Sequence, residues 1–300
     1  MLDGLEIIDC HHHLWDLTAN YYPWLTDKIG TRVCGDYAVI RKNYLLGDFF
    51  RDAAGLNLVK SVHVQAEIDH RDPVRETRWL QAVADGPDSR GFPHGIVAYA
   101  NLADPDVEAV IEAHMRFPNV RGVRQLLHEG RLDPAHPAPS PLTNPIWRKN
   151  LDLLRRFGLS FDLQVFPEQM PGAVEVVGEN PDLQFILVHT GQPRRRDAEG
   201  LQEWRRGMRA LAEAPNVSAK ISGLGMFDRA WTVESLRPFV LETIGIFTPG
   251  RCLFASNFPV DGMMSTYRRL WEAYDIITAA FSRDERTSLF AGNARRLYRL

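Results

Sequence analysis

The chain has 300 residues, of which 45% are hydrophobic and 24% charged, an ordinary globular composition. Its formal net charge is −3 without a long run of one sign, which disfavours binding to nucleic acid or to a membrane surface. No apolar stretch reaches the ~20 residues that a membrane span requires, and no signal peptide precedes the first apolar run. The cysteines show no paired spacing, so we expect a reducing compartment, the cytoplasm.

Short apolar runs alternate with longer amphipathic stretches along the whole chain. We predict strands at residues 5–13, 59–66, 95–102, 120–127, 159–166, 184–190, 217–222 and 252–257. The later runs recur every ~25–40 residues, the length of one strand, one helix and two turns. Such units without a linker predict a single domain over residues 1–300, an α/β fold of the (β/α)8 TIM-barrel type. A doubly wound sheet is the alternative, but no Gly-x-Gly-x-x-Gly turn follows the first strand.

Several helix starts share one signal, an Asp or Asn followed by proline. The three instances are Asp72-Pro73, Asp104-Pro105 and Asn144-Pro145. Each places a capping side chain before a proline, which suits the first helical position. These signals predict helices over residues 74–84, 106–117 and 146–157.

Two predicted connections are too long to be plain turns, and both leave the carboxyl ends of strands. Residues 16–58 follow the first strand and contain Tyr21, Tyr22 and Trp24, and residues 128–144 follow the fourth strand. Long loops on this face of a barrel often carry function, so both are candidate lids. The aromatic residues fit packing on the barrel rim equally well.

The most informative motif ends the first predicted strand, at Asp9-Cys10-His11-His12-His13. In an extended strand alternate side chains share a face, so Asp9, His11 and His13 should point one way. Cys10 and His12 should point the other way. Two imidazoles spaced like His11 and His13 can hold one metal ion or one anionic reacting centre, although packed, hydrogen-bonded histidines are the structural alternative.

Polar residues also end the other predicted strands, where a barrel interior should be apolar. They are His63, Gln65 and Glu67 at strand two, Arg124 at strand four, Asp162 and Gln164 at strand five, His189 at strand six, Ser218, Lys220 and Ser222 at strand seven, and Asn257 at strand eight. Buried charges need partners, so we expect Asp162 to pair with a cation such as Lys220. His189 should face the histidines of the first strand across the barrel mouth.

Taken in order, these motifs resemble the amidohydrolase superfamily, in particular its branch of sugar lactonases and 2-pyrone-4,6-dicarboxylate lactonase. The resemblance spans Ile7 to Leu300 and rests on Asp9-x-His11-x-His13-x-Trp15, Val64-Gln65-Ala66, Gly122-Val123-Arg124, Phe161-Asp162-Leu163, His189-Thr190-Gly191-Gln192-Pro193, Lys220-Ile221-Ser222-Gly223-Leu224, Ser256-Asn257-Phe258-Pro259-Val260-Asp261 and Gly292-Asn293-Ala294-x-x-x-Tyr298. It implies a TIM barrel, hydrolysis of a cyclic ester, and frequent homo-oligomers.

Two departures from the family pattern leave the presence of a metal open. The family's usual aspartate after strand eight is Asn257 here, and an amide is neither a general base near neutral pH nor a strong metal ligand. Much of the superfamily also has a metal-binding histidine on strand five, which this chain lacks. His11, His13 and His189 can still hold zinc with a water in the fourth position. Part of this branch works without a metal, so the two outcomes are equally expected.

The resemblance implies hydrolysis of a lactone, a small-molecule substrate, and we assign roles on that basis. Zinc held by the three histidines would polarise the carbonyl; without zinc, Arg124, His13 and Asn257 would form an oxyanion hole. The general base would be His189 or Asp261, which lies four residues beyond Asn257. We expect the substrate to contact Arg124, Gln65, Glu67, Gln164, Trp15 and Tyr22.

Two other functions stay open from the sequence. A metal-dependent, non-oxidative decarboxylase shares the superfamily and the first-strand motif, although it usually needs the aspartate that Asn257 replaces. A catalytically degenerate barrel would bind a small acid without turning it over. The presence of His11, His13, His189 and Arg124 counts against this second alternative.

Overall fold

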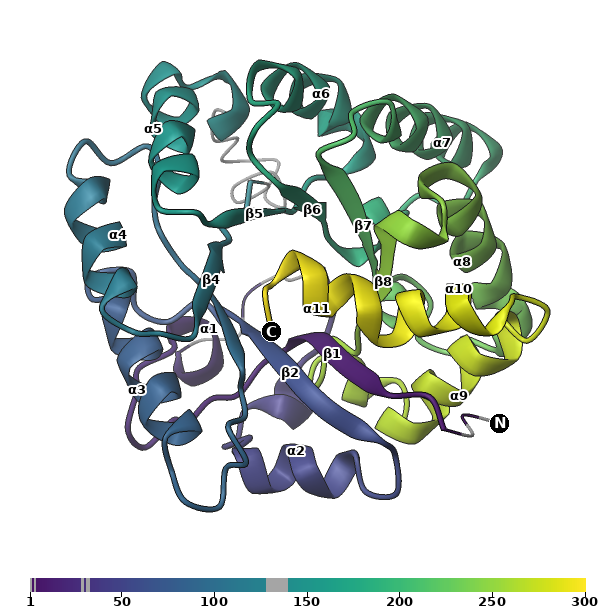
Figure 1. Cartoon of the computed structure of the whole chain (residues 1–300), viewed down its shortest axis with the longest axis horizontal. Helices are drawn as coiled ribbons and strands as arrows, with labels where there is room; N and C mark the ends of the chain where they lie inside the picture. The colour runs from purple at the N-terminus through teal and green to yellow at the C-terminus, as the bar shows by residue number, and fades with distance from the viewer. Residues whose placement is uncertain (1, 3, 28–29, 31–32, 128–139) are drawn as a thin grey trace.

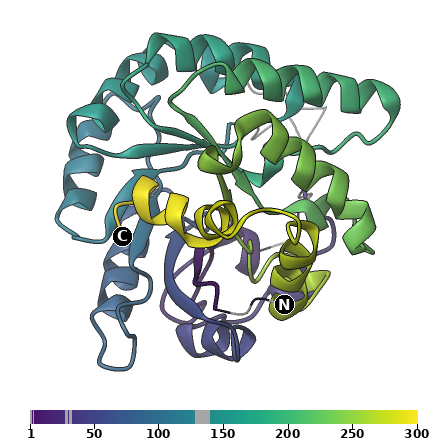
Figure 2. The same ribbon diagram turned by 45° about the vertical axis from the view of Figure 1, so that its right-hand side comes forward.

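Eight parallel strands form the centre of the protein. The computed structural model describes residues 2, 4–27, 30, 33–127 and 140–300. Its strands are β1 (Ile7–His12), β2 (Leu58–Val64), β3 (Gly95–Ala98), β4 (Val120–Val123), β5 (Ser160–Leu163), β6 (Phe185–Leu187), β7 (Val217–Ile221) and β8 (Cys252–Phe254). Each strand pairs in parallel with the next one along the chain, and helices flank the strands on the outside (Figures 1 and 2). The prediction of a (β/α)8 TIM barrel is confirmed.

The helices alternate with the strands along the chain. They are α1 (Pro23–Thr26), α2 (Leu46–Asp52), α3 (Val74–Ala84), α4 (Val107–Met115), α5 (Pro145–Arg156), α6 (Met170–Glu179), α7 (Ala198–Ala212), α8 (Val233–Phe247), α9 (Tyr267–Ile277), α10 (Arg283–Thr287) and α11 (Asn293–Leu297). In α5 the side chains of Trp147, Leu151 and Leu154 recur at helical spacing and are buried against the barrel. Among the described residues, no helix is both long and apolar enough to cross a membrane.

One of the three predicted capping signals works as expected. The Asn144 side chain accepts hydrogen bonds from the backbone N–H groups of Ile146 and Trp147, and Pro145 opens α5. The other two helices begin after the proline rather than at it, because Pro73 and Asp106 occupy the N-cap positions of α3 and α4. There the proline belongs to the turn that leads into the helix.

Every strand ends earlier than its apolar run predicts, and the backbone of the rim residues gives one reason. Glu67 after β2, His189, Thr190 and Gln192 after β6, and Asn257 after β8 all have positive φ angles, from 51° to 58°. This left-handed conformation is incompatible with an extended strand. The chain therefore turns at these positions and re-aims the side chains that follow the strands.

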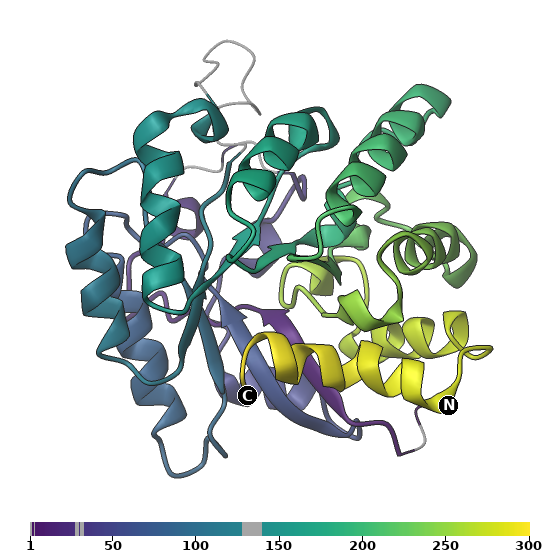
Figure 3. The ribbon, with the colours of Figure 1, turned by 45° about the horizontal axis from the view of Figure 1, so that its top comes forward.

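An apolar cluster in the barrel interior packs against side chains of the last helix. Ile8 and Cys10 of β1 and Val64 of β2 belong to one buried cluster with Leu297 and Tyr298 at the end of α11. The helix lies against β1 and β8 and crosses the barrel, as the yellow ribbon shows (Figure 3). This helix closes the end of the barrel that is opposite to the rim described above.

The predicted alternation of side chains along β1 is wrong at Asp9. Cys10 packs inside the barrel, whereas the Asp9 carboxylate accepts a hydrogen bond of 3.0 Å from the Tyr267 hydroxyl of α9. Asp9 therefore faces the helical layer and shares no face with His11 and His13. A register shift between β1 and β2 that follows Asp9 breaks the strict alternation on which the prediction depended.

The barrel closes between β8 and β1 mainly beyond the ends of these strands. The Asn257 N–H donates to the His11 carbonyl at 2.7 Å, and the His13 N–H donates to the Phe258 carbonyl at 2.7 Å. The Asp9 carboxylate adds bonds from the N–H and hydroxyl of Ser256 at 3.0 and 2.6 Å. This seam fixes the two histidines and Asn257 relative to one another.

Candidate active site

A pocket of about 740 Å³, part of it open to solvent, lies at the carboxyl ends of the strands. This is the face on which TIM barrels carry their active sites. The lining residues follow seven of the eight strands: His13, Trp24, Val33, Cys34, Ala66, Glu67, Arg124, Leu126, Gln164, His189, Gln192, Met226, Asn257 and Val260. Six of the residues that the sequence singled out are among them.

The three predicted histidines converge at this pocket: His13 and His189 line it, and His11 lies against both rings. The ring centroid of His11 lies 5.1 Å from that of His13 and 4.5 Å from that of His189. Hydrogen bonds orient the outer two rings: Nδ1 of His13 bonds to the Val64 carbonyl at 2.7 Å, and Nδ1 of His189 bonds to the Ser222 hydroxyl at 3.1 Å. The structure thus brings together His11, His13 and His189 from β1 and β6.

Burial keeps the rings of His11 and His13 neutral. It lowers the pKa of His11 well below the ordinary value, and the charges of His189, Lys220, His13 and Arg124 lower this pKa further. Burial, followed by the Arg124 guanidinium, lowers the pKa of His13 in the same way. Neither ring nitrogen of His11 has a hydrogen-bond partner within the described part of the chain. These imidazoles are therefore lone-pair donors rather than cations at neutral pH.

Arg124 supplies the positive charge of the pocket. It is 4% exposed; its guanidinium donates to Gln164 Oε1 at 3.1 Å and to the Gln65 carbonyl, while Nε has no partner among the residues described. Burial lowers its pKa, although Glu67 and other carboxylates oppose this effect. Since a guanidinium carries five N–H groups in a plane, Arg124 keeps donors for a ligand oxygen.

Glu67 supplies the negative charge. Its left-handed backbone, with φ of 58°, turns the side chain into the pocket, where the Gln65 amide and His70 Nε2 bond to the carboxylate. Burial raises the pKa of Glu67, but the bond with His70 and the charge of Arg124 outweigh it and lower the pKa to about 2. Glu67 is therefore an anion throughout the neutral range.

Asn257 and Asp261 form a buried, hydrogen-bonded pair at the pocket. Asn257 lines the pocket, and its Nδ2 donates to Asp261 Oδ1 at 2.8 Å. Asp261 is 2% exposed and does not line the pocket. Burial raises the pKa of Asp261 to about 7, although the bond from Asn257 lowers it. Asp261 thus orients the Asn257 amide rather than meeting a ligand directly.

The structure does not bring Trp15, Tyr22 and Gln65 to the pocket. Trp15 is fully buried behind His13, and its indole N–H donates to the Lys42 carbonyl at 2.7 Å. Tyr22 is fully buried in the core, and the Gln65 side chain points to Glu67. The prediction that these three residues contact the substrate rests on the spacing along the strands and the composition of the loop. Neither feature determines which way a side chain points in an irregular segment.

Trp24 is the aromatic residue that the first long loop contributes to the pocket. Its indole N–H donates to the Ala66 carbonyl at 2.7 Å, which ties α1 to the end of β2. Val33 and Cys34 of the same loop also line the pocket. The described part of this loop thus contributes to the pocket wall, and its role as a lid stays a prediction; residues 128–139 of the second candidate lid lie outside the described residues.

Gln192 is the most notable residue that the prediction of site residues omitted. It lines the pocket after β6, is fully buried, and neither Oε1 nor Nε2 of its amide has a partner in the described ranges. Leaving a buried polar group unpaired costs roughly 1–3 kcal/mol, so such groups are rare in folded proteins. The sequence signal was its place in the motif that begins at His189.

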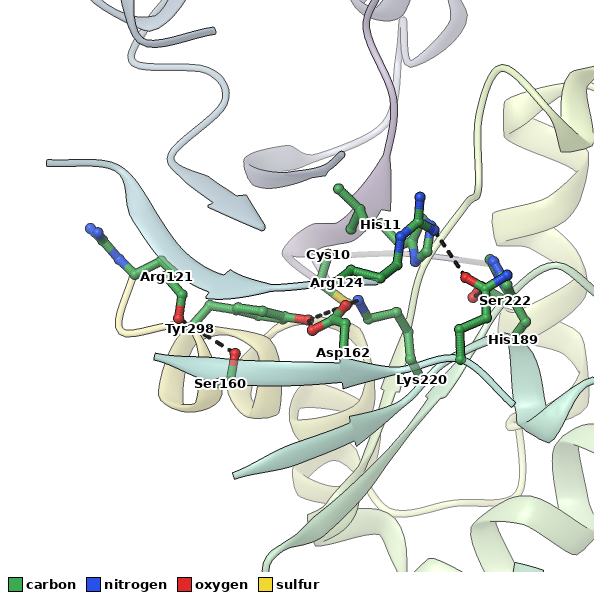
Figure 4. Close-up of polar contacts among 12 residues, drawn as sticks. Cys10, His11, Arg121, Arg124, Ser160, Asp162, His189, Lys220, Ser222 and Tyr298 are labelled. Carbon is green, nitrogen blue, oxygen red and sulfur yellow. Dashed lines mark hydrogen bonds and ion pairs between the residues drawn. The ribbon is translucent and has the colours of Figure 1, made fainter. Parts of the chain in front are cut away.

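A charged network lies below the pocket, inside the barrel. Lys220 Nζ of β7 lies 2.6 Å from Asp162 Oδ2 of β5, and both side chains are fully buried. The Tyr298 hydroxyl donates to the same carboxylate at 2.9 Å from below (Figure 4). The predicted pairing of Asp162 with Lys220 is confirmed, so this carboxylate serves the barrel interior and not the pocket.

The donor set at the three histidines does not fit a divalent metal as it stands. No group of three or more His, Cys, Asp or Glu side chains in the described residues is placed to hold a metal ion. Arg124 and Lys220 also bring positive charge to His11, and the carboxylate of Asp261 is turned to Asn257. Three neutral histidines can hold zinc without an anionic ligand, but the positive charges beside His11 oppose a dication, so the chemistry below is derived without one.

A family model described as Amidohydrolase matches residues 8–300. The chain belongs to the amidohydrolase family. Among curated proteins, it is 46% identical over 304 residues to the uncharacterized protein y4mH of Sinorhizobium fredii, and the match covers 100% of both chains. It is 25% identical over 305 residues to an L-fucono-1,5-lactonase of Burkholderia ambifaria, covering 98% of this chain and 95% of the relative.

The amidohydrolase fold is also seen in solved structures. A zinc-bound amidohydrolase from Burkholderia multivorans superposes with a TM-score of 0.81 at 24% identity, over 98% of this chain and 99% of that one. At this identity the likeness concerns the fold. It agrees with the eight-stranded barrel described above.

Proposed function

We propose that this amidohydrolase opens lactones, cyclic esters, by attack of water on the ester carbonyl. The observation that carries the proposal is the convergence of Arg124, the histidine rings and Asn257 on one pocket at the barrel rim. The L-fucono-1,5-lactonase of Burkholderia ambifaria, similar over 98% of this chain, supports the same reaction class.

The charges in the pocket favour an uncharged ring over a carboxylated one. Among the described residues that line it, Arg124 is the cation and Glu67 is the anion, so the two compensate each other. The remaining polar lining consists of amides and imidazoles, namely His13, His189, Gln164, Gln192 and Asn257. Such groups pair with hydroxyls, which both donate and accept hydrogen bonds.

The chain's own residues account for each step of the hydrolysis. The planar donors of Arg124 bind the carbonyl oxygen and stabilise the negative charge that develops on it. His189, oriented through Nδ1 by Ser222, takes a proton from the attacking water as the water oxygen bonds to the carbonyl carbon. The ester C–O bond then breaks, and the ring oxygen receives that proton from His189. Asn257, held by Asp261, positions the water.

A screen of lactones with a pH indicator tests this proposal. We expect acid release from uncharged sugar lactones, and at least a 100-fold lower kcat in His189→Gln, in line with the loss of a general base. Ser222→Ala should lower kcat by roughly 10-fold, because it disorients the base without removing it. Activity should persist after dialysis against a chelator. His114→Gln is the matched control, since its ring bonds to Thr77 and to the Tyr99 carbonyl outside the pocket.

Three results would contradict the proposal. Retention of full activity in His189→Gln would exclude His189 as the base. Loss of activity on chelation, restored by zinc, would show that the reaction requires a metal and would overturn the metal-free steps given above. Release of carbon dioxide from hydroxybenzoates without any lactone opening would favour the decarboxylase alternative.

A further inference from the structure

We propose that Gln192 recognises a hydroxyl group on the ring of the substrate, so that this pocket selects polyhydroxylated lactones over their deoxy analogues. The inference rests on the proposed lactonase activity and assigns a specificity role to a residue outside the catalytic steps. Gln192 lies three residues after His189, the proposed base, and both residues line the pocket. A group that binds the ring here would also hold the carbonyl near His189.

The first observation is that the amide of Gln192 is uncommitted. It is fully buried, and neither Oε1 nor Nε2 has a hydrogen-bond partner in the described part of the chain. Gln169 behaves differently: its Nε2 donates to the Leu127 carbonyl at 2.9 Å, and its Oε1 accepts from the Phe166 N–H at 3.0 Å. An unsatisfied buried amide requires an explanation, and a ligand that pairs with it supplies one.

The second observation is that the loop around Gln192 is fixed. The four residues from His189 to Gln192 all have positive φ, at 54°, 56°, 65° and 51°. The Gln192 N–H donates to the His189 carbonyl at 2.8 Å. A Cβ atom at Gly191 would lie 2.6 Å from Met208 Sδ and 2.7 Å from Met170 Cε, so the loop packs tightly on α6 and α7. Such strain persists only where the surroundings enforce it, and it clusters at functional sites.

The third argument concerns the chemical group of the substrate that would pair with the Gln192 amide. An amide offers a carbonyl acceptor and N–H donors side by side, which match one hydroxyl or two neighbouring hydroxyls of a ring. A carboxylate on the ring would gain no net attraction, because the charges of Arg124 and Glu67 compensate each other in the same pocket. Gln192 is therefore suited to a hydroxylated and uncharged ring. Sites that bind a substrate hydroxyl through buried groups reject the analogue without it, because those groups are then left unpaired.

The test combines deletion of the side-chain amide with deletion of substrate hydroxyls. We would measure kcat/KM of the wild type and of Gln192→Met on one aldonolactone and on the set of its single-deoxy analogues. The wild type should lose roughly 100-fold or more on one of these analogues. Gln192→Met should lose a similar factor on the parent lactone, while its discrimination against that analogue falls below about 10-fold. A folding defect would lower all rates equally and leave this ratio unchanged.

Gln169→Met is the matched control, because it removes a buried amide that already has two protein partners. It should lower the melting temperature but keep the discrimination of the wild type. If Gln192→Met also keeps that discrimination, or if the wild type opens all analogues equally well, the inference is wrong. If the parent lactone binds but is not opened, only the proposed hydrolysis fails. In that case calorimetry gives the Kd of the parent lactone and of the deoxy analogue, and the ratio of the two Kd values in the wild type and in Gln192→Met tests the role of Gln192. A wild type that neither opens nor binds the parent overturns both proposals.

Discussion

At the scale of single residues, the pair of Asn257 and Asp261 sets the character of the site. An amide donor satisfies one oxygen of the buried carboxylate, whose pKa is raised to about 7 by burial. An aspartate at position 257 would instead place two carboxyl groups in direct contact away from water. Two such groups can both be ionised only if a cation lies between them. Otherwise they share a proton, and only one of the two is ionised.

We therefore predict that Asn257→Asp lowers stability as the pH rises and gains affinity for divalent cations. The unfolding free energy should fall by about 1–3 kcal/mol near pH 8 relative to the wild type, and the difference should shrink near pH 5. Denaturant unfolding at both pH values, with elemental analysis for zinc, measures the two effects. Asp261→Asn is the control, because it removes the charge and should show neither effect. A variant with unchanged stability and less bound metal than the wild type would contradict this account.

The residue scale also shows where prediction of the site succeeded. His11, His13 and His189 converge as predicted because strand ends in a barrel meet at one rim. The aromatic residue was misplaced, since Trp24 lines the pocket and Trp15 and Tyr22 do not. Loop residues follow no period, so a sequence pattern cannot tell which of several neighbouring aromatic rings turns inward.

At the scale of elements, Asp162, Lys220 and Tyr298 connect β5, β7 and the end of α11. Both charged side chains are fully buried, and the tyrosine hydroxyl lies 2.9 and 3.1 Å from the two carboxylate oxygens. A buried ion pair of this kind is weak evidence for stability, but breaking it is costly. The remaining charge would then lie in the barrel interior without a partner.

We predict that Lys220→Met destabilises the protein by about 3–5 kcal/mol, because it leaves the Asp162 carboxylate unpaired. Tyr298→Phe should cost only about 1–2 kcal/mol, since the ion pair stays in place. The double variant Lys220→Met with Asp162→Leu should recover part of the loss. Denaturant titrations of the three proteins measure these values. Equal effects of the two single variants would argue against the ion pair as the dominant contact.

The elements themselves were predicted well where burial follows a period. Runs of apolar residues located all eight strands, because an interior strand must be apolar on both faces. The strand ends were wrong because polar rim residues such as Glu67 and His189 adopt a left-handed backbone, which is uncommon for any residue other than glycine and is not indicated by an apolar run. The face of Asp9 was wrong because a register shift is set by the partner strand.

At the scale of the whole molecule, three buried carboxyl groups share one electrostatic property. Burial raises the pKa of Asp9 to about 6 and the pKa values of Glu76 and Asp261 to about 7. In the unfolded chain these groups titrate near 4. Between these values each of the three groups binds more proton in the folded protein than in the unfolded chain, so its contribution to stability decreases as the pH rises through this window. Buried histidines such as His11 and His13, whose pKa values are lowered, contribute with the opposite sign below about pH 6.5.

We predict that each of these three groups contributes a decline of the unfolding free energy from about pH 4 to its folded pKa of about 6 or 7, which is measured as the difference between the wild type and a variant without that group. Glu76→Gln should flatten this decline, and the contribution of one such group is on the order of a few kcal/mol. Denaturant unfolding at a series of pH values measures the slope. Glu175→Gln is the control, because its carboxylate is exposed at 70%. An identical slope in wild type and Glu76→Gln would contradict the assignment.

The seam between β8 and β1 has a consequence for how the enzyme matures. The histidines of β1 and Asn257 come from opposite ends of the chain, and hydrogen bonds such as that from Asn257 to the His11 carbonyl hold them in register. A nascent or refolding chain can build most of its parallel sheet from neighbouring units before these distant segments meet. Turnover should therefore be the last native property to return on refolding, later than secondary structure or tryptophan burial.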